Sequence, residues 1–234
     1  ITLTIGLFLV FFKKFQFRKI SIYQKIISVL SGYVILPIFI SIPYYFSIYN
    51  ISFINCYFES ISGFTSTGFS MFENIKQIDQ SLITWRSTSQ WIGGIYFLFS
   101  ILLLIDIFDE NLKKSFTNFS SLSSQEIIKQ AFKIIIIYSL LTFFIFILLK
   151  IVDLRTFDAF NLSMTLISSG GFVPVNNFDL LFTTDISKIT LSILMLSSYF
   201  SLFFIYNLIN LKKKNFNFLS EDFNLLIYLM IVIS

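Results

Sequence analysis

The sequence predicts an all-α integral membrane protein, built from repeated helix–pore loop–helix modules. The composition, four long uncharged stretches and an internal repeat lead to this fold class. Of the 234 residues, 56% are hydrophobic, 13% are charged and 32 are phenylalanine. The mean hydropathy is +0.81. Because a soluble domain has about 25% charged residues, the residues left over here cannot build a water-facing surface.

The composition also excludes several function classes. The chain has no histidine and a single cysteine, Cys56, which excludes disulfide frameworks, histidine proton relays, Ser-His-Asp or Cys-His hydrolases and Cys/His metal sites. An intramembrane enzyme would need catalytic polar side chains within the spans, and the acid near a predicted span is Asp106. We therefore expect no enzyme and no organic cofactor. The modest net charge of +4 predicts no nucleic-acid partner.

Four stretches without charge predict membrane-spanning helices, because a span needs roughly 20 mostly apolar residues. The stretches cover residues 26–58, 87–105, 134–149 and 189–211. The third is short, but Lys133 and Lys150 flank it and can extend toward the membrane surface. Barrel strands would alternate apolar and polar residues over shorter distances. We therefore expect helices near 26–48, 86–106, 132–152 and 187–210, with partial helices over 1–12 and about 222–234.

The distribution of basic residues predicts the orientation. Alternate loops hold twelve of the seventeen lysines and arginines, and the positive-inside rule makes those loops cytoplasmic. The opposite loops, which contain the predicted pore loops, then face outward from the cytoplasmic (inner) membrane. They carry seven acids. These acids indicate either a solvated surface or a mildly acidic mouth that concentrates cations.

The chain repeats with an offset of 102 residues. Phe58-Glu59 falls on Phe160-Asn161, Ser66-Thr67-Gly68 falls on Ser168-Ser169-Gly170, and Arg86 falls on Lys188. Internal repeats are a common construction of transporters. The chain begins and stops inside hydrophobic runs, so we expect a fragment of a longer protein. Its expected segments are the end of a preceding transmembrane helix with a cytoplasmic linker (1–20), a first module (21–110), a cytoplasmic linker (111–123), a second module (124–212) and the start of a third (213–234).

Each module contains a segment that is too apolar for a water-facing loop and too short to span. Residues 53–70 and 156–172 each combine a helix of about ten residues with a run of Ser, Thr and Gly. Irregular backbone at membrane depth is tolerated where it is buried in protein or lines a watery cavity. Its carbonyls, like those of a potassium filter, can replace the water shell of a cation. An ordinary external loop with a Ser/Thr/Gly turn is the alternative.

At these residues the chain resembles the Trk/Ktr/HKT superfamily of potassium transporters, and most of all the membrane subunit of the bacterial Trk type. The resemblance covers nearly the whole chain and rests on a pore helix with its filter, Phe58 to Gly68, and on a helix opening with Trp85-Arg86-Ser87 and Gln90-Trp91-Ile92-Gly93-Gly94. Asn55 departs from the usual aspartate at the start of the pore helix, whereas Asp158 keeps it. Ile95 and Tyr96 stand where the family often has another glycine.

The resemblance implies repeated modules arranged as in potassium channels, four around one pore. It also implies a lipid-embedded homodimer, gated by a cytoplasmic nucleotide-binding regulatory subunit. The transported ion would be K⁺, since Gly68 occupies the position where serine accompanies sodium preference. A sodium-conducting relative and a membrane scaffold without a pore are the alternatives.

The predicted filter residues would bind the ion mainly through backbone carbonyls: Thr65, Ser66, Thr67, Gly68, Ile167, Ser168, Ser169 and Gly170. Three residues are expected to support the filter: Gly63, Arg86 and Gly171. For Arg86 the alternative is an anchor at an interface. Glu59 could support the filter from behind or face outer water, and the sequence does not decide between the two. Cys56 is expected to be a packing residue.

Overall fold

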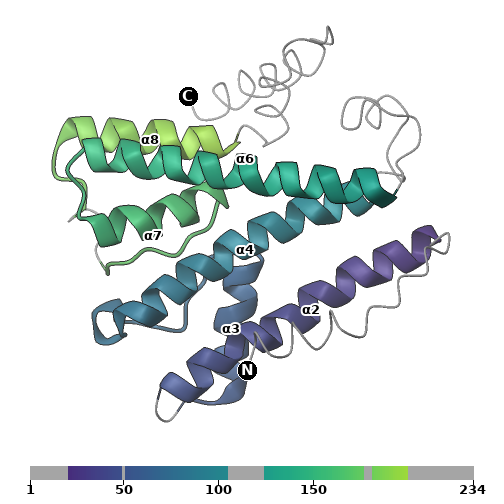
Figure 1. The fold of residues 1–234 in the computed structure, drawn as a ribbon. Coiled ribbons are helices and arrows are strands. Elements are labelled where there is room, and N and C mark those ends of the chain that lie inside the picture. Colours follow the sequence, from purple (N-terminus) through teal and green to yellow (C-terminus); the bar gives the residue numbers. More distant parts are fainter. Residues whose placement is uncertain (1–20, 49–50, 105–123, 177–180, 200–234) are drawn as a thin grey trace, which may run out of the picture.

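A computed structural model describes residues 21–48, 51–104, 124–176 and 181–199, and every regular element in these ranges is helical. The first group comprises α2 (Ile22–Ser47), α3 (Phe53–Phe64), the 3₁₀ turn η1 (Ile75–Gln77) and α4 (Gln80–Leu104). The second group comprises α6 (Ser124–Ile151), α7 (Thr156–Ile167) and α8 (Asp185–Tyr199). Each group places one short helix between two longer ones, as the repeat predicts (Figure 1).

Three of the long helices, α2, α4 and α6, are long and apolar enough to cross a membrane. They begin four to eight residues before the predicted spans, because polar residues extend each helix beyond its uncharged part. At the start of α2, for example, the Ser21 hydroxyl accepts from the Gln24 N–H (3.3 Å) and the Gln24 side chain accepts from the Ser21 N–H (3.0 Å), which forms a capping box.

The fourth predicted span is described as far as Tyr199. The partial helices predicted at the two ends, and the segments 1–20, 111–123 and 213–234, lie outside the described residues. Nothing in the described ranges tests the predicted segment boundaries.

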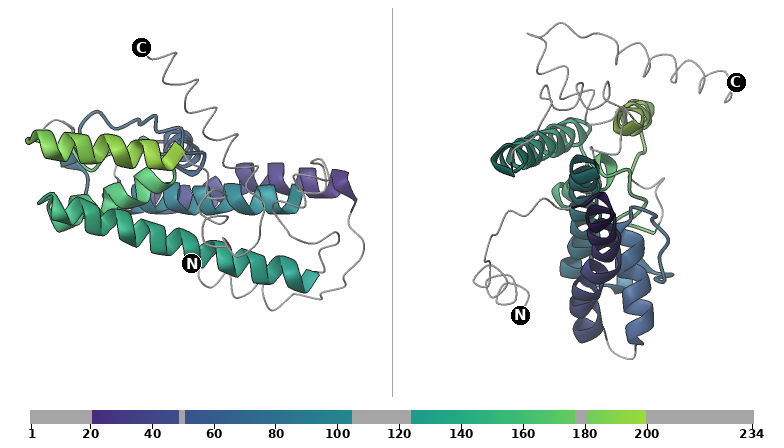
Figure 2. Two further views of the ribbon diagram at one scale, coloured as in Figure 1. Left: turned by 90° about the horizontal axis from the view of Figure 1, so that it is seen from above. Right: turned by 90° about the vertical axis from the view of Figure 1, so that its right-hand side faces the viewer.

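Helix α4 lies centrally between the two groups (Figure 1). It contacts α2 and α3 of its own group and α6 and α7 of the other. The left-hand view of Figure 2 shows α2, α4 and α6 lengthwise. One apolar cluster, which contains Leu98, Leu102, Ile134 and Tyr138, joins α4 to α6. The two groups therefore share α4 as a common packing surface.

Large apolar side chains also point away from these contacts. Tyr23, Ile27 and Leu30 on α2, and Phe132 and Leu140 on α6, are each at least 60% exposed. An open apolar surface along helices of spanning length suits contact with lipid tails. The chain is thus a multi-pass membrane protein.

Candidate functional site

The same backbone bend follows each short helix. After α3, the Ser62 carbonyl accepts from the Thr67 N–H (2.9 Å) and the Gly63 carbonyl accepts from the Ser66 N–H (3.0 Å). After α7, the Thr165 carbonyl accepts from the Gly170 N–H (2.8 Å). Both Ser66 and Ser169 have φ = +54°, a left-handed conformation that few non-glycine residues adopt. The predicted Ser/Thr/Gly runs therefore form matching, locally defined bends.

The two bends are related by 103 residues, so the sequence register of 102 is wrong by one at this place. The offset of 103 relates the bounds of α3 and α7, the φ-positive serines and the matching hydrogen bonds. In this register Gly68 corresponds to Gly171 and Thr67 corresponds to Gly170. Because residues 170 and 171 are both glycine, the glycines by themselves are compatible with an offset of either 102 or 103. The Gly-Phe pairs 68–69 and 171–172 are the sequence signal that selects the observed one.

Ile167, the first residue of the predicted second filter, is the last residue of α7 and corresponds in this register to Phe64, the last residue of α3. Its side chain packs against two apolar clusters. The second bend therefore begins at Ser168, directly after α7.

The two bends meet at their glycines. Gly68 has φ = +80°, and a Cβ built on it would lie 2.5 Å from the Gly171 Cα and 2.8 Å from the Gly171 nitrogen. A Cβ on Gly171 would lie 3.0 Å from the Gly68 Cα. A side chain at Gly68 is excluded both by its backbone angle and by this backbone approach. Residues about one hundred positions apart are thus brought into direct contact.

Hydroxyl groups around the bends bond mostly to nearby backbone. Thr65 Oγ1 donates to the Ile61 carbonyl (2.7 Å) and lies 2.7 Å from Thr67 Oγ1. Ser62 Oγ donates to the Phe69 carbonyl (2.5 Å), and Ser168 Oγ is 3.0 Å from the Met164 and Thr165 carbonyls. These side chains fix the shape of the bends, and the backbone oxygens are the groups available to a ligand.

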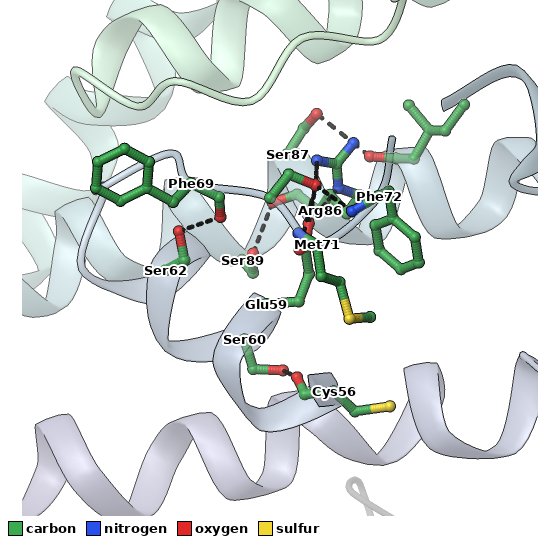
Figure 3. Close-up of polar contacts among 12 residues, drawn as sticks. Cys56, Glu59, Ser60, Ser62, Phe69, Met71, Phe72, Arg86, Ser87 and Ser89 are labelled. Atoms are coloured by element: carbon green, nitrogen blue, oxygen red, sulfur yellow. Dashed lines mark hydrogen bonds and ion pairs between the residues drawn. The ribbon is translucent and has the colours of Figure 1, made fainter. Parts of the chain in front are cut away.

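A buried ion pair lies behind the first bend (Figure 3). Arg86 Nε donates to Glu59 Oε1 at 2.7 Å, and the two side chains are 2% and 0% exposed. The Glu59 carboxylate also accepts from the Met71 N–H (2.9 Å), and Ser70 Oγ links it to Arg86 Nη2 (2.9 Å). Glu59 thus lies inside the protein and does not face outer water. Together with Arg86 it joins α3, α4 and the segment that follows the bend.

The adjacent glycines of α4 let two other elements approach it. A Cβ on Gly93 would overlap the Phe64 carbonyl at the end of α3. One on Gly94 would overlap the Tyr138 hydroxyl and lie 3.2 Å from the Ser168 Cβ. Gly63 likewise leaves room for Ser89 of α4 and for the ring of Phe172. The glycines in the sequence motif therefore serve helix packing around both bends.

Known proteins resemble the chain at the level of sequence and of fold. No family model matches. An uncharacterised cation transporter of Methanocaldococcus jannaschii is 28% identical over 224 residues, which cover 93% of this chain and 46% of that protein. The Trk system potassium uptake protein TrkI of Halomonas elongata is 32% identical over 73 residues, 31% of this chain and 15% of that protein.

The crystal structure of the potassium transporter TrkH from Vibrio parahaemolyticus matches the fold with a TM-score of 0.65. The match covers 80% of this chain and 38% of TrkH, at 22% identity. Taken together, these similarities in sequence and fold support a member of the Trk-type transporter superfamily. The match covers nearly all of this chain, but the chain spans about half the length of the Methanocaldococcus jannaschii cation transporter. The all-helical fold predicted for this superfamily is confirmed.

Gly93→Ala should weaken the packing of α3 on α4. Because the new Cβ overlaps a backbone carbonyl, we expect a loss of about 1–3 kcal/mol of unfolding free energy, typical of overpacking. Ser81→Ala, at an exposed position of the same helix, is the control, since it adds no atom to a packed contact. Thermal unfolding of the purified protein in detergent measures both. Equal melting temperatures for the two variants would contradict the packing role of Gly93.

Glu59→Gln should destabilise the protein strongly, because it leaves the Arg86 guanidinium buried without its counter-charge. Breaking such a pair costs about 3–5 kcal/mol. The control is Glu73→Gln, the same substitution at an exposed glutamate, where we expect a loss of about 0–1 kcal/mol. The same unfolding assay compares the two variants, and a loss at Glu59 no larger than at Glu73 would refute the role of the buried pair.

Proposed function

We propose that this chain forms two pore modules of a potassium uptake protein in the cytoplasmic membrane. The observation that carries the proposal is the direct contact of the two bends at Gly68 and Gly171. It places two stretches of irregular backbone at one point between helices of spanning length. The names of the relatives, a cation transporter, a potassium uptake protein and a potassium transporter, support the same class of substrate.

The proposed ion ligands are backbone carbonyls of Thr65, Ser66, Thr67 and Gly68 in the first bend. In the second bend they are those of Ser168, Ser169, Gly170 and Gly171. Gly171 takes the place of Ile167 in this set, because the 103-residue register pairs Gly171 with Gly68 and Ile167 with Phe64. Carbonyl oxygens replace the water shell of K⁺ in known filters. The C-terminal ends of α3 and α7, which carry partial negative charge, lead directly into the bends and favour a cation there.

Transport would need no covalent step. The membrane potential supplies about 2.3 kcal/mol per charge for each 100 mV, which drives a cation inward once its dehydration is compensated. The positive-inside rule places the bends toward the outer face. By the family resemblance, two further modules complete the pore, the protein forms a homodimer, and a cytoplasmic nucleotide-binding subunit gates it.

Gly68→Ala in the full-length protein tests this function. The added Cβ would collide with the Gly171 backbone and strain a left-handed residue, so we expect rubidium uptake to fall at least tenfold in cells that lack other potassium systems. Ser81→Ala, at an exposed position of α4 away from both bends, is the control and should keep uptake within about threefold of wild type. Membrane abundance of each variant is measured by immunoblotting.

Undiminished uptake in Gly68→Ala would refute the filter assignment. Absence of rubidium, potassium and sodium uptake by the wild-type protein would favour a scaffold. Sodium uptake without potassium uptake would instead identify a sodium-conducting relative.

A further inference from the structure

Helix α4 belongs to the first module, yet one of its faces holds the bend of the second. Arg86, Gln90 and Gly93 recur at helical spacing on this face, and Arg86 and Gln90 are almost fully buried. With its amide turned so that both its oxygen and its nitrogen are satisfied, Gln90 Oε1 accepts from the Gly171 N–H (3.1 Å) and from the Phe172 N–H (3.2 Å). One side-chain oxygen thus binds two consecutive backbone N–H groups.

This contact determines where two carbonyls point. In a planar trans peptide the N–H and the C=O face opposite ways, and the peptide bonds here are trans. An N–H of Gly171 directed at Gln90 therefore turns the Gly170 carbonyl away from α4. The N–H of Phe172 does the same for the Gly171 carbonyl. Two successive carbonyls then point to one side, whereas in an ordinary strand successive carbonyls alternate.

The residue after this bend is held by the same helix. Phe172 is 2% exposed, and the Arg86 guanidinium carbon lies 4.2 Å from the centre of its ring, a cation–π distance. Gly63 leaves the space, since a Cβ there would lie 3.0 Å from the ring of Phe172. Gly170 leaves room for Gln90 in the same way, because a Cβ on it would overlap the Gln90 side chain.

The second module offers no matching support in the part of the chain that the structure describes. The positions that the 102-residue repeat pairs with Arg86 and Gln90 are Lys188 and Ser192, and both are exposed. Ser192 Oγ donates to the Lys188 carbonyl of its own helix (2.9 Å). The support is therefore one-sided, from α4 to the second bend.

We propose that Gln90 is a positioning residue that aligns the carbonyls of Gly170 and Gly171 from behind and thereby sets the ion preference of the second bend. The selectivity role rests on the proposed transport function. The alignment itself is a property of the folded chain and can be measured without transport.

Two variants of the full-length protein test the role in selectivity. Gln90→Leu removes the acceptor at similar volume, and Gly170→Ala pushes the Gln90 side chain away. We expect the ratio of potassium to sodium uptake to fall at least tenfold in both variants. Gln80→Leu, at an exposed glutamine that begins α4, is the control and should leave the ratio unchanged.

Amide hydrogen exchange tests the alignment directly. In the purified wild-type protein the N–H groups of Gly171 and Phe172 should exchange slowly, and in Gln90→Leu they should exchange at least tenfold faster. Fast exchange of both groups in the wild-type protein would overturn the proposal, even if Gln90→Leu fails to fold. If the wild-type protein transports potassium and Gln90→Leu leaves the ratio of potassium to sodium uptake unchanged, the selectivity role alone is overturned. A wild-type protein that transports no cation would instead overturn the proposed function.

Discussion

The structure around the bends depends on one constraint: irregular backbone inside a membrane protein needs protein partners for its N–H groups. The described residues meet it with carbonyls at the helix ends and with two side chains behind the bends. The Ser62 carbonyl serves the first bend, the Glu59 carboxylate takes the Met71 N–H, and the Gln90 amide takes two N–H groups of the second bend. A buried carboxylate is costly unless it is paired, so the use of Glu59 as an acceptor requires Arg86. The ion pair is thus a consequence of the bend.

Helix α4 provides many of the contacts that hold the bends. Its polar side chains bind both bends, and its glycines allow the end of α3 and the Tyr138 hydroxyl to come close. A helix that packs on two re-entrant segments must present small residues where backbone approaches and polar residues where N–H groups face it. The helix pattern Arg86-Gln90-Gly93 meets both needs on one face. This arrangement also makes the geometry of the second bend depend on residues of the first module.

The two modules have the same backbone conformation at their bends and differ in the ion pairs nearby. Beyond the glycines the two copies touch through their asparagines, with Asn176 Nδ2 donating to Asn74 Oδ1 at 2.6 Å. The acid lies in the middle of α3 in the first copy and at the start of α7 in the second. Both acids are buried, but Glu59 pairs with the buried Arg86, whereas Asp158 pairs with the exposed Arg155. A repeat can keep its bends while its ion pairs move, since the bends are specified by glycine and by helix-end carbonyls.

Composition and uncharged length determined the helical membrane fold, because burial in lipid imposes a strong and local requirement on every residue of a span. Local chemistry also located both short helices and both Ser/Thr/Gly bends. The tertiary structure decided the rest. It chose the alignment of Gly68 with Gly171 and settled the burial of Glu59. It also showed that Gln90 binds the second bend. In the sequence, Gln90 was part of a motif and had no assigned role. Each of these depends on contacts between residues 27 to about 103 positions apart, which no local pattern in the chain encodes.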